Sequence, residues 1–170
     1  MRTFSFLPIV LLIAALWVSP SAMAQPSMRQ LFISMPDSIL PTLTTNNRLD
    51  MVDFLDARMK AEVTNALDGK SRLTDLQADQ LTLDMSEALS IRMMLLDIQQ
   101  PVDSATQVIA VLRTYRLLSD STATETVPSF YSLKWNLLSA PPRLTATARQ
   151  LIESLPPSSI LKRDDELIIK

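Results

Sequence analysis

The sequence contains no histidine and no cysteine, and glycine occurs only at position 69. Without histidine, Ser-His-Asp and Cys-His catalysis are excluded, and zinc, haem and blue-copper sites lose their usual ligands. Without cysteine, the chain has neither a disulfide nor a lipid-modified N-terminal cysteine. A single glycine also excludes the glycine-rich loops that hold phosphate groups. We therefore expect no cofactor and no metal, and any catalysis would depend on carboxylate, Lys, Arg, Tyr or Ser side chains.

Residues 1–24 have the organisation of a secretory signal peptide. Arg2 precedes an apolar run over residues 4–18, and a Ser-Pro-Ser segment leads to the small-x-small sequence that ends at Ala24. The apolar run is short for a membrane span, so cleavage after Ala24 is favoured over an uncleaved anchor. We expect an exported protein, periplasmic or secreted, that is not a lipoprotein and has no transmembrane segment after cleavage.

The expected mature chain, residues 25–170, has the length of one domain. The full sequence has a net charge of −2 and no run of basic residues. Nucleic-acid binding therefore has no electrostatic support.

Residues 25–69 are predicted to be helical. Ser27 can cap a short helix that carries apolar residues at three- and four-residue spacing and stops at Pro36. The strongest helical pattern runs from about Arg48 to Leu67, and Asn46 or Asn47 can cap its first turn. Its apolar stripe spans five turns and comprises Leu49, Val52, Leu55, Met59, Val63, Ala66 and Leu67. Gly69 is the expected left-handed residue that ends this helix.

Residues 79–138 change to a period of two, which predicts four antiparallel strands. These cover residues 80–86, 89–96, 106–118 and 127–138, with a Ser/Thr-rich loop at 119–126. Residues 139–170 are predicted to contain a helix at about 145–155 and a tail whose last five residues form either a fifth strand or a loose end.

The expected fold class is α+β. It consists of a four- or five-stranded antiparallel meander sheet that is covered on one face by a long amphipathic helix and shorter helices. The alternative is a small closed barrel with a helical plug, which the scarcity of glycine disfavours.

Three carboxylates at positions 50, 53 and 56 are spaced three apart on the predicted long helix. Asp53, Asp56 and Lys60 lie near the margin of its apolar stripe and are the weak candidates for an acid/base or cation site. The favoured interpretation is structural: Asp50 and Asp53 compensate the helix dipole, and Asp56–Lys60 and Arg58–Glu62 form ion pairs one turn apart.

Two aromatic positions are candidates for a binding surface. Phe54 lies opposite the apolar stripe, so either the N-terminal turns pack over it or it faces a partner. Trp135 shares the fourth predicted strand with Phe130 and Tyr131. Aromatic residues on strands belong mostly to the core, whereas a sugar-stacking platform would require an exposed Trp135. The spacing does not decide whether Arg113 and Lys134 face solvent or pair with acidic residues.

Three segments, MPDSILPTLTTNNRLDMVDF, NALDGKSRL and VPSFYSLKW, resemble an uncharacterised secreted family of Bacteroidales bacteria. The resemblance implies an envelope location and a domain of unknown function, and it carries no catalytic residues. Secreted proteins of these bacteria are often O-glycosylated at Asp-Ser or Asp-Thr followed by an apolar residue or Thr. The resemblance therefore implies candidate glycosylation at Ser38, Ser104 and Ser121, with Ser121 in its Ser/Thr-rich loop the best placed.

We interpret the sequence as an exported, non-enzymatic domain that binds another envelope or secreted protein or glycan. The alternative is a carboxylate-based hydrolase that acts on glycan through Asp53 and Asp56. The two functions require different surfaces. A hydrolase needs a concave pocket with a pair of carboxylates, whereas a binding domain needs an exposed apolar patch.

Overall fold

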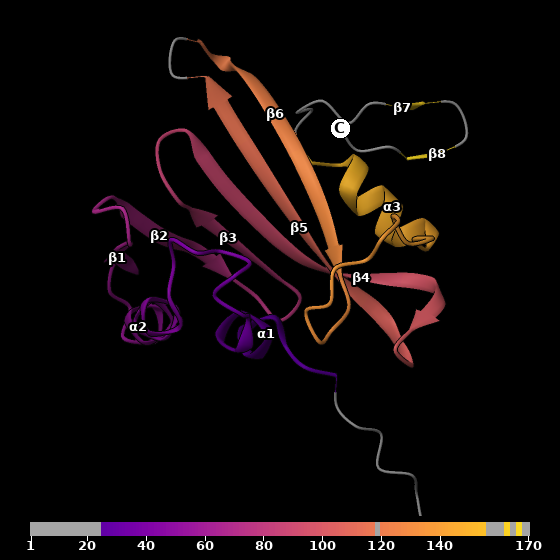
Figure 1. The fold of residues 1–170 in the computed structure, drawn as a ribbon, viewed down its shortest axis with the longest axis horizontal. Helices are drawn as coiled ribbons and strands as arrows, with labels where there is room; N and C mark the ends of the chain where they lie inside the picture. Colours follow the sequence, from indigo (N-terminus) through magenta and orange to yellow (C-terminus); the bar gives the residue numbers. More distant parts are fainter. Residues whose placement is uncertain (1–24, 118–119, 156–161, 164–165, 168–170) are drawn as a thin grey trace, which may run out of the picture.

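The computed structural model describes residues 25–117, 120–155, 162–163 and 166–167 (Figure 1). The predicted signal peptide at residues 1–24 lies outside these residues. Two helices come first, α1 (Met28–Ser34) and α2 (Thr45–Asp56), and α3 (Ala146–Glu153) follows the main sheet. The strands of that sheet are β1 (Glu62–Thr64), β2 (Lys70–Leu76), β3 (Gln80–Asp84), β4 (Leu89–Val102), β5 (Ala105–Leu117) and β6 (Asp120–Tyr131).

The sheet has six strands in the order of the sequence, and each strand is antiparallel to its neighbours. The antiparallel sheet that the sequence predicted is thus confirmed. The two longest strands, β4 and β5, are joined by the two-residue turn Asp103-Ser104, where both residues have positive φ (50° and 68°). That is the backbone of a type I′ hairpin turn, whose twist matches the twist of the strands.

Each face of the sheet carries its own hydrophobic core. On one face, which we call the α1–α2 face, both N-terminal helices pack against residues such as Leu81, Met93 and Val111. On the other, the α3 face, α3 packs against residues such as Met94 and Ala110. The far ends of β5 and β6 extend beyond all three helices (Figure 1).

The predicted fold class is therefore wrong in its main features. The sheet has six strands instead of four or five, three short helices replace the long one, and helices pack on both faces. The structure is also no closed barrel, because among the described strands β1 and β6 form opposite edges of the sheet.

The predicted helix from Arg48 to Leu67 ends instead at Asp56. Arg58 takes a left-handed conformation with φ of 57°, and its amide donates to the Leu55 carbonyl at 3.0 Å. The Met59 amide reaches back to the Phe54 carbonyl at 2.8 Å. These two bonds make a Schellman turn, which usually uses glycine at the left-handed position. Because arginine occupies that position, the sequence gives no visible stop signal.

The predicted apolar stripe of that helix is not one buried surface. Met59 and Leu67 are 60% and 77% exposed, whereas Val63 is buried within β1. The buried residues of α2 are Arg48, Met51 and Val52. The N-cap is Thr44, and Asn47 completes the capping box instead of acting as the cap itself.

Gly69 lies in the turn between β1 and β2 and ends no helix. The positive φ of this turn belongs to Asp68, at 59°. A Cβ atom at position 69 would lie 3.2 Å from Asn65 Nδ2. Asn65 Oδ1 accepts hydrogen bonds from the amides of Leu67 and Gly69, so the glycine lets the backbone approach this side chain closely.

The fourth predicted strand is displaced along the sequence. β6 begins at Asp120, inside the predicted Ser/Thr-rich loop, and ends at Tyr131. After it the chain turns, with the Trp135 amide bonded to the Ser132 carbonyl at 2.9 Å and Trp135 at a φ of 64°. Thr residues such as Thr124 and Thr126 pair with β5, so the polar composition of this segment concealed a strand.

The described residues of the predicted tail, Glu166–Leu167, lie outside the main sheet. β7 (Lys162–Arg163) pairs with β8 (Glu166–Leu167) in a separate two-stranded ribbon. Residues 168–170 of the predicted tail lie outside the described part. The helix α3 begins after Thr145, whose hydroxyl accepts from the Ala148 amide.

Candidate binding surfaces on the projecting strands

The carboxylates of the candidate acid/base site lie apart from any hollow described below. Asp50, Asp53 and Asp56 are exposed on α2. Asp56 is held by two hydrogen bonds from Arg29 of α1, at 2.6 and 2.8 Å, and this lowers the pKa of Asp56. Lys60, beyond the end of the helix, instead pairs with Glu62 at 2.5 Å. The early end of α2 thus separates the predicted Asp56–Lys60 and Arg58–Glu62 partners.

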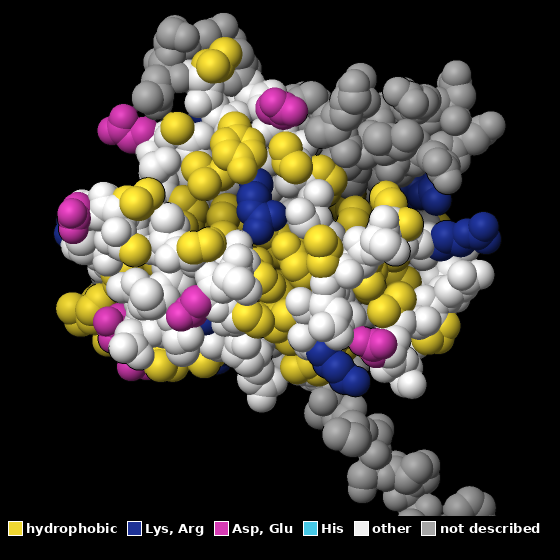
Figure 2. All heavy atoms as spheres, in the orientation of Figure 1, with side chains coloured by type: hydrophobic (Ala, Val, Ile, Leu, Met, Phe, Trp, Pro, Cys, Tyr) yellow, Lys and Arg dark blue, Asp and Glu magenta, His cyan; other side chains and the backbone are white. Residues whose placement is uncertain are grey.

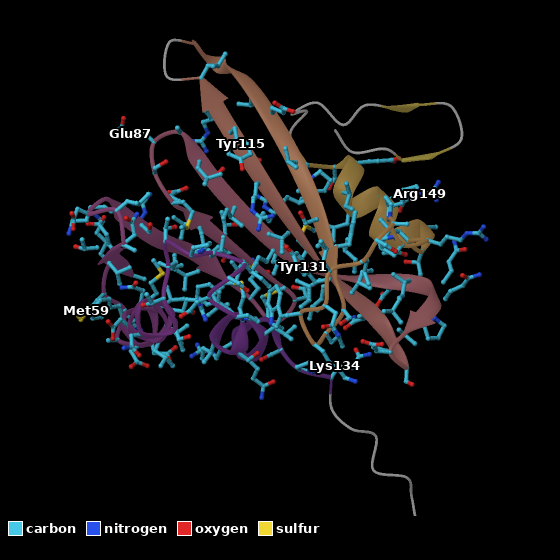
Figure 3. The ribbon with its side chains drawn as sticks, in the orientation of Figure 1. Met59, Glu87, Tyr115, Tyr131, Lys134 and Arg149 are labelled. Carbon is cyan, nitrogen blue, oxygen red and sulfur yellow. The ribbon has the colours of Figure 1, made fainter. Side chains whose placement is uncertain are left out.

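The aromatic candidates belong to the core of the α1–α2 face. Phe54 is half-buried against that core. Trp135 is 8% exposed, donates its indole N–H to the Leu31 carbonyl at 3.1 Å, and packs on the ring of Tyr131 at 5.7 Å. A sugar-stacking platform needs an exposed ring, whereas the Trp135 ring is buried. Lys134, next to it, is exposed (Figure 3).

A buried arginine that the sequence analysis missed fixes the connection between α1 and α2. Arg48 is 0% exposed and donates to the carbonyls of Met35 and Leu43, to the hydroxyl of Thr45, and to the carboxylate of Asp37. It lies in the first of the three segments that carry the family resemblance. Its role is structural, because every one of these partners belongs to the connection itself or to its ends.

An apolar patch lies on the α1–α2 face where β5 and β6 extend beyond the helices. Tyr115, Leu117 and Val127 are 45%, 59% and 39% exposed, and we call them the Tyr115 patch. Tyr115 and Leu117 are two residues apart on β5, so they share this face, and Val127 is the diagonal neighbour of Tyr115 across the pair of strands. Figure 2 shows hydrophobic side chains gathered over this face, and Figure 3 shows Tyr115 on the projecting part of β5.

Arg113 lies one position deeper on the same face and links the projecting strands to the helical layer. It is half-buried, and its guanidinium donates to the Ser129 hydroxyl and to the Ile39 carbonyl, both at 3.2 Å. The guanidinium is thus engaged by the domain itself, and the surface above it consists of the Tyr115 patch and the exposed Glu125 opposite Tyr115.

The opposite, α3 face holds a groove of about 320 Å³ beside the C-terminal end of α3. Its floor consists of side chains on β3, β4, β5 and β6 that point to this face, and Ile91, whose side chain belongs to the opposite core, also borders it. The lining residues are Thr82, Asp84, Ser90, Ile91, Arg92, Leu112, Thr114, Arg116, Thr124, Thr126 and Leu155. Hydroxyl groups dominate the floor, and the Oγ1 atoms of Thr114 and Thr126 are 2.9 Å apart.

The charges of this groove do not cancel. Its one carboxylate, Asp84, forms an ion pair with Arg72 at 2.8 Å. Arg116 donates only to the Ser90 hydroxyl, at 3.3 Å, and half-buried Arg92 forms neither a hydrogen bond nor an ion pair with the described residues. We call this surface the Arg92 groove. Sequence reasoning missed it because its residues come from four strands that only the sheet register brings together.

A second, smaller hollow of about 200 Å³ lies beside the end of β6. It is lined by residues 128–130 and 137–141, none of which is charged. Among the described residues, no cluster of three or more acidic side chains is placed to hold a metal ion. No helix in the described ranges is long and apolar enough to cross a membrane.

Two of the three candidate glycosylation sites have described side chains. Ser38 is exposed in the turn after α1, and Ser104 is exposed in the β4–β5 turn. Ser121 lies in strand β6, where the sequence predicted a Ser/Thr-rich loop. Its side chain is outside the described part. Glycosylation at these positions stays a prediction.

Comparison with known proteins places the fold and the family. The chain is similar to a solved structure, a domain of an uncharacterized protein from Porphyromonas gingivalis W83, with a TM-score of 0.53 and 22% sequence identity. The match covers 68% of this chain and 55% of that chain, so this protein corresponds to only about half of the neighbour's length. At this identity the likeness concerns the fold alone. No curated protein matches the chain in sequence.

The family model described as "Protein of unknown function (DUF3256)" matches residues 20–158, which is most of the chain. The predicted resemblance to a family of unknown function is thereby confirmed, while secretion and a Bacteroidales origin stay predictions. The chain belongs to the DUF3256 family of proteins of unknown function.

Proposed function

We propose that this protein is an exported, non-enzymatic domain that binds another envelope or secreted protein through the Tyr115 patch. The observation that carries this proposal is the exposure of three large apolar side chains on one face of the projecting strands. Complete burial of such a side chain contributes about 1.5–3 kcal/mol, so the patch can supply a substantial part of the free energy of association.

The position of the patch also supports binding. Tyr115 combines a large apolar ring with a hydroxyl group, a combination that is enriched at protein interfaces. The patch lies on paired strands instead of a loop, because Tyr115 is opposite Glu125 of β6 and Leu89 of β4. A partner would therefore meet a surface that is already ordered, which lowers the entropic cost of association.

The hydrolase alternative has less support. Glycoside hydrolysis by the common mechanism needs two carboxylates that flank the bond to be cleaved. The larger described groove is lined by a single carboxylate, Asp84, which Arg72 already engages. Asp53 and Asp56 line neither hollow.

The patch is tested in the native cells with a tagged full-length chain and chemical crosslinking before purification. The Tyr115→Ser/Val127→Ser variant is compared with Leu67→Ser, which removes a more exposed apolar side chain (77%) in the β1–β2 turn. We expect a discrete crosslinked partner with the native protein and with Leu67→Ser, and its loss with the double variant. Equal recovery from all three proteins would refute binding through this patch.

Export is tested separately on the same material. Cell fractionation and the intact mass of the purified protein show whether residues 1–24 are removed and whether glycans are attached. We expect an N-terminus at Gln25 in the envelope or the medium. A cytoplasmic protein that retains Met1 would contradict export, and an unmodified mature mass would contradict glycosylation at Ser38, Ser104 and Ser121.

A further inference from the structure

The Arg92 groove is a second candidate surface, separate from the Tyr115 patch because it lies on the opposite face of the same strands. Along β5, Tyr115 and Leu117 point to the α1–α2 face, and Thr114 and Arg116 point to the α3 face. Each surface can therefore be changed without changing the other.

The register of the sheet brings two guanidinium groups to the floor of this groove. Arg92 lies beside Leu112, and two residues earlier on β4, Ser90 lies beside Thr114. Arg116 is the next residue along β5 on this face and reaches back to the Ser90 hydroxyl at 3.3 Å. Ser90 and Arg92 are separated by about 7 Å along one strand, so both guanidinium groups can engage one short ligand.

The unpaired state of Arg92 points to a negatively charged ligand. Arg92 is half-buried as a residue, and a guanidinium that is drawn toward a groove floor and loses hydration is normally compensated by a carboxylate or by several hydrogen bonds. Within the described ranges, Arg92 has neither. The carboxylate that lines the groove, Asp84, is engaged by Arg72. A planar guanidinium matches a carboxylate with two parallel hydrogen bonds.

The other residues that line the groove favour a peptide ligand over a sugar. No aromatic ring lines the groove, and rings are the surfaces on which sugars stack. Threonine and serine hydroxyls can both donate to and accept from the main chain of an extended peptide. Leu112 and Leu155 give an apolar contact for a neighbouring side chain. A volume of about 320 Å³ suits a short segment of chain.

We propose that the Arg92 groove binds a short acidic peptide segment of a partner protein, with Arg92 and Arg116 holding its carboxylates. The hydroxyl-bearing floor holds the peptide main chain, and the apolar end beside α3 accepts an adjacent aliphatic side chain. This recognition needs no contribution from the Tyr115 patch.

Fluorescence anisotropy tests the proposal with the mature protein and a short labelled peptide in which Glu alternates with Val. The matched probe has Gln in place of every Glu, and an oligogalacturonate is the acidic-sugar probe. We expect binding of the Glu peptide that weakens with added salt, about tenfold weaker binding of the Gln peptide, and no tighter binding of the sugar.

The variants assign the binding to the groove. Arg92→Gln and Arg116→Gln are each expected to weaken binding of the Glu peptide about tenfold. Arg143→Gln and Arg149→Gln remove the same charge from exposed positions outside the groove and are expected to leave binding unchanged. The Tyr115→Ser/Val127→Ser variant should also bind the peptide normally, which separates this proposal from the proposed function.

Three outcomes would overturn the proposal: equal affinity for the Glu and Gln peptides, equal losses in the groove and control variants, or tighter binding of the acidic sugar than of the peptide. Circular dichroism and thermal melting of each variant show whether a loss comes from unfolding. If Arg92→Gln fails to fold, Arg116→Gln, at an exposed position, decides the outcome.

Discussion

Arg48 Nη1 lies 2.9 Å from Asp37 Oδ1, although the arginine is fully buried and the side chain of Asp37 is 54% exposed. Within the described residues, the carboxylate of Asp37 is thus the one negative charge that contacts the buried guanidinium, and it lies at the edge of solvent. Two backbone carbonyls and the Thr45 hydroxyl complete the set of acceptors. The short segment between α1 and α2 is therefore organised around one guanidinium, and not around apolar contacts alone.

We predict that Arg48→Ala is among the most destabilising substitutions in the domain. It leaves the carbonyls of Met35 and Leu43 without their donor and opens a cavity, so a loss of about 3 kcal/mol in the free energy of unfolding is expected. Urea denaturation measures this loss. Arg149→Ala, at an exposed position on α3, should change the free energy by less than about 0.5 kcal/mol. A loss from Arg48→Ala as small as that of the control would show that the buried network contributes little.

We predict that the domain loses stability as the medium becomes acidic, in part through Asp37. The Thr45 hydroxyl and the Arg48 guanidinium both donate to this carboxylate and lower its pKa. A carboxyl group whose pKa is lowered by folding stabilises the folded state above its unfolded pKa of about 3.9, and the contribution is lost as the pH falls through the lower, folded pKa. Urea midpoints measured from about pH 6 down to about pH 3 test this. Asp37→Asn should flatten the dependence, and an identical slope in both proteins would contradict the prediction.

We predict that Arg58→Gly stabilises the domain. Arg58 has a φ of 57°, which costs a non-glycine residue about 1 kcal/mol, and its side chain is exposed. Glycine removes this cost, partly offset by its greater freedom in the unfolded chain, so a gain of up to about 1 kcal/mol is expected. Asp53→Gly is the control, because it places glycine inside α2 and should destabilise by about 0.5–1 kcal/mol. If Arg58→Gly lowers the free energy of unfolding as Asp53→Gly does, the left-handed turn at Arg58 is contradicted.

We predict that Trp135→Phe destabilises the domain by about 1 kcal/mol or more. Phenylalanine retains an aromatic ring beside Tyr131 but cannot donate to the Leu31 carbonyl. Thermal unfolding of this variant is compared with that of Tyr115→Phe, which changes an aromatic residue that is 45% exposed and should have little effect. If the two variants melt at the same temperature, the indole hydrogen bond between the turn after β6 and α1 is not a stabilising link.

Parts of the fold could be predicted from the sequence because they depend on local patterns. Ser27 caps α1, and the alternation of apolar residues located β3, β4 and β5. The end of α2 could not be predicted, because Arg58 supplies the left-handed turn without glycine. β2 gave no clear alternation either. Its two buried residues are Ser71 and Leu73, and the serine hydroxyl is satisfied by Asn65 and the Met85 carbonyl.

The candidate surfaces depended still more on tertiary structure. The sequence determined that Tyr115 and Leu117 share a face of a strand with buried residues such as Val111. It also predicted that helices cover the whole of that face. Only the tertiary structure decided where the helical layer ends, because α1 and α2 bury Val111 but leave Tyr115 exposed. The Arg92 groove likewise requires the register of four strands. The physical reason is the same in both cases: alternation sets the face to which a side chain points, whereas burial depends on which other elements pack against it.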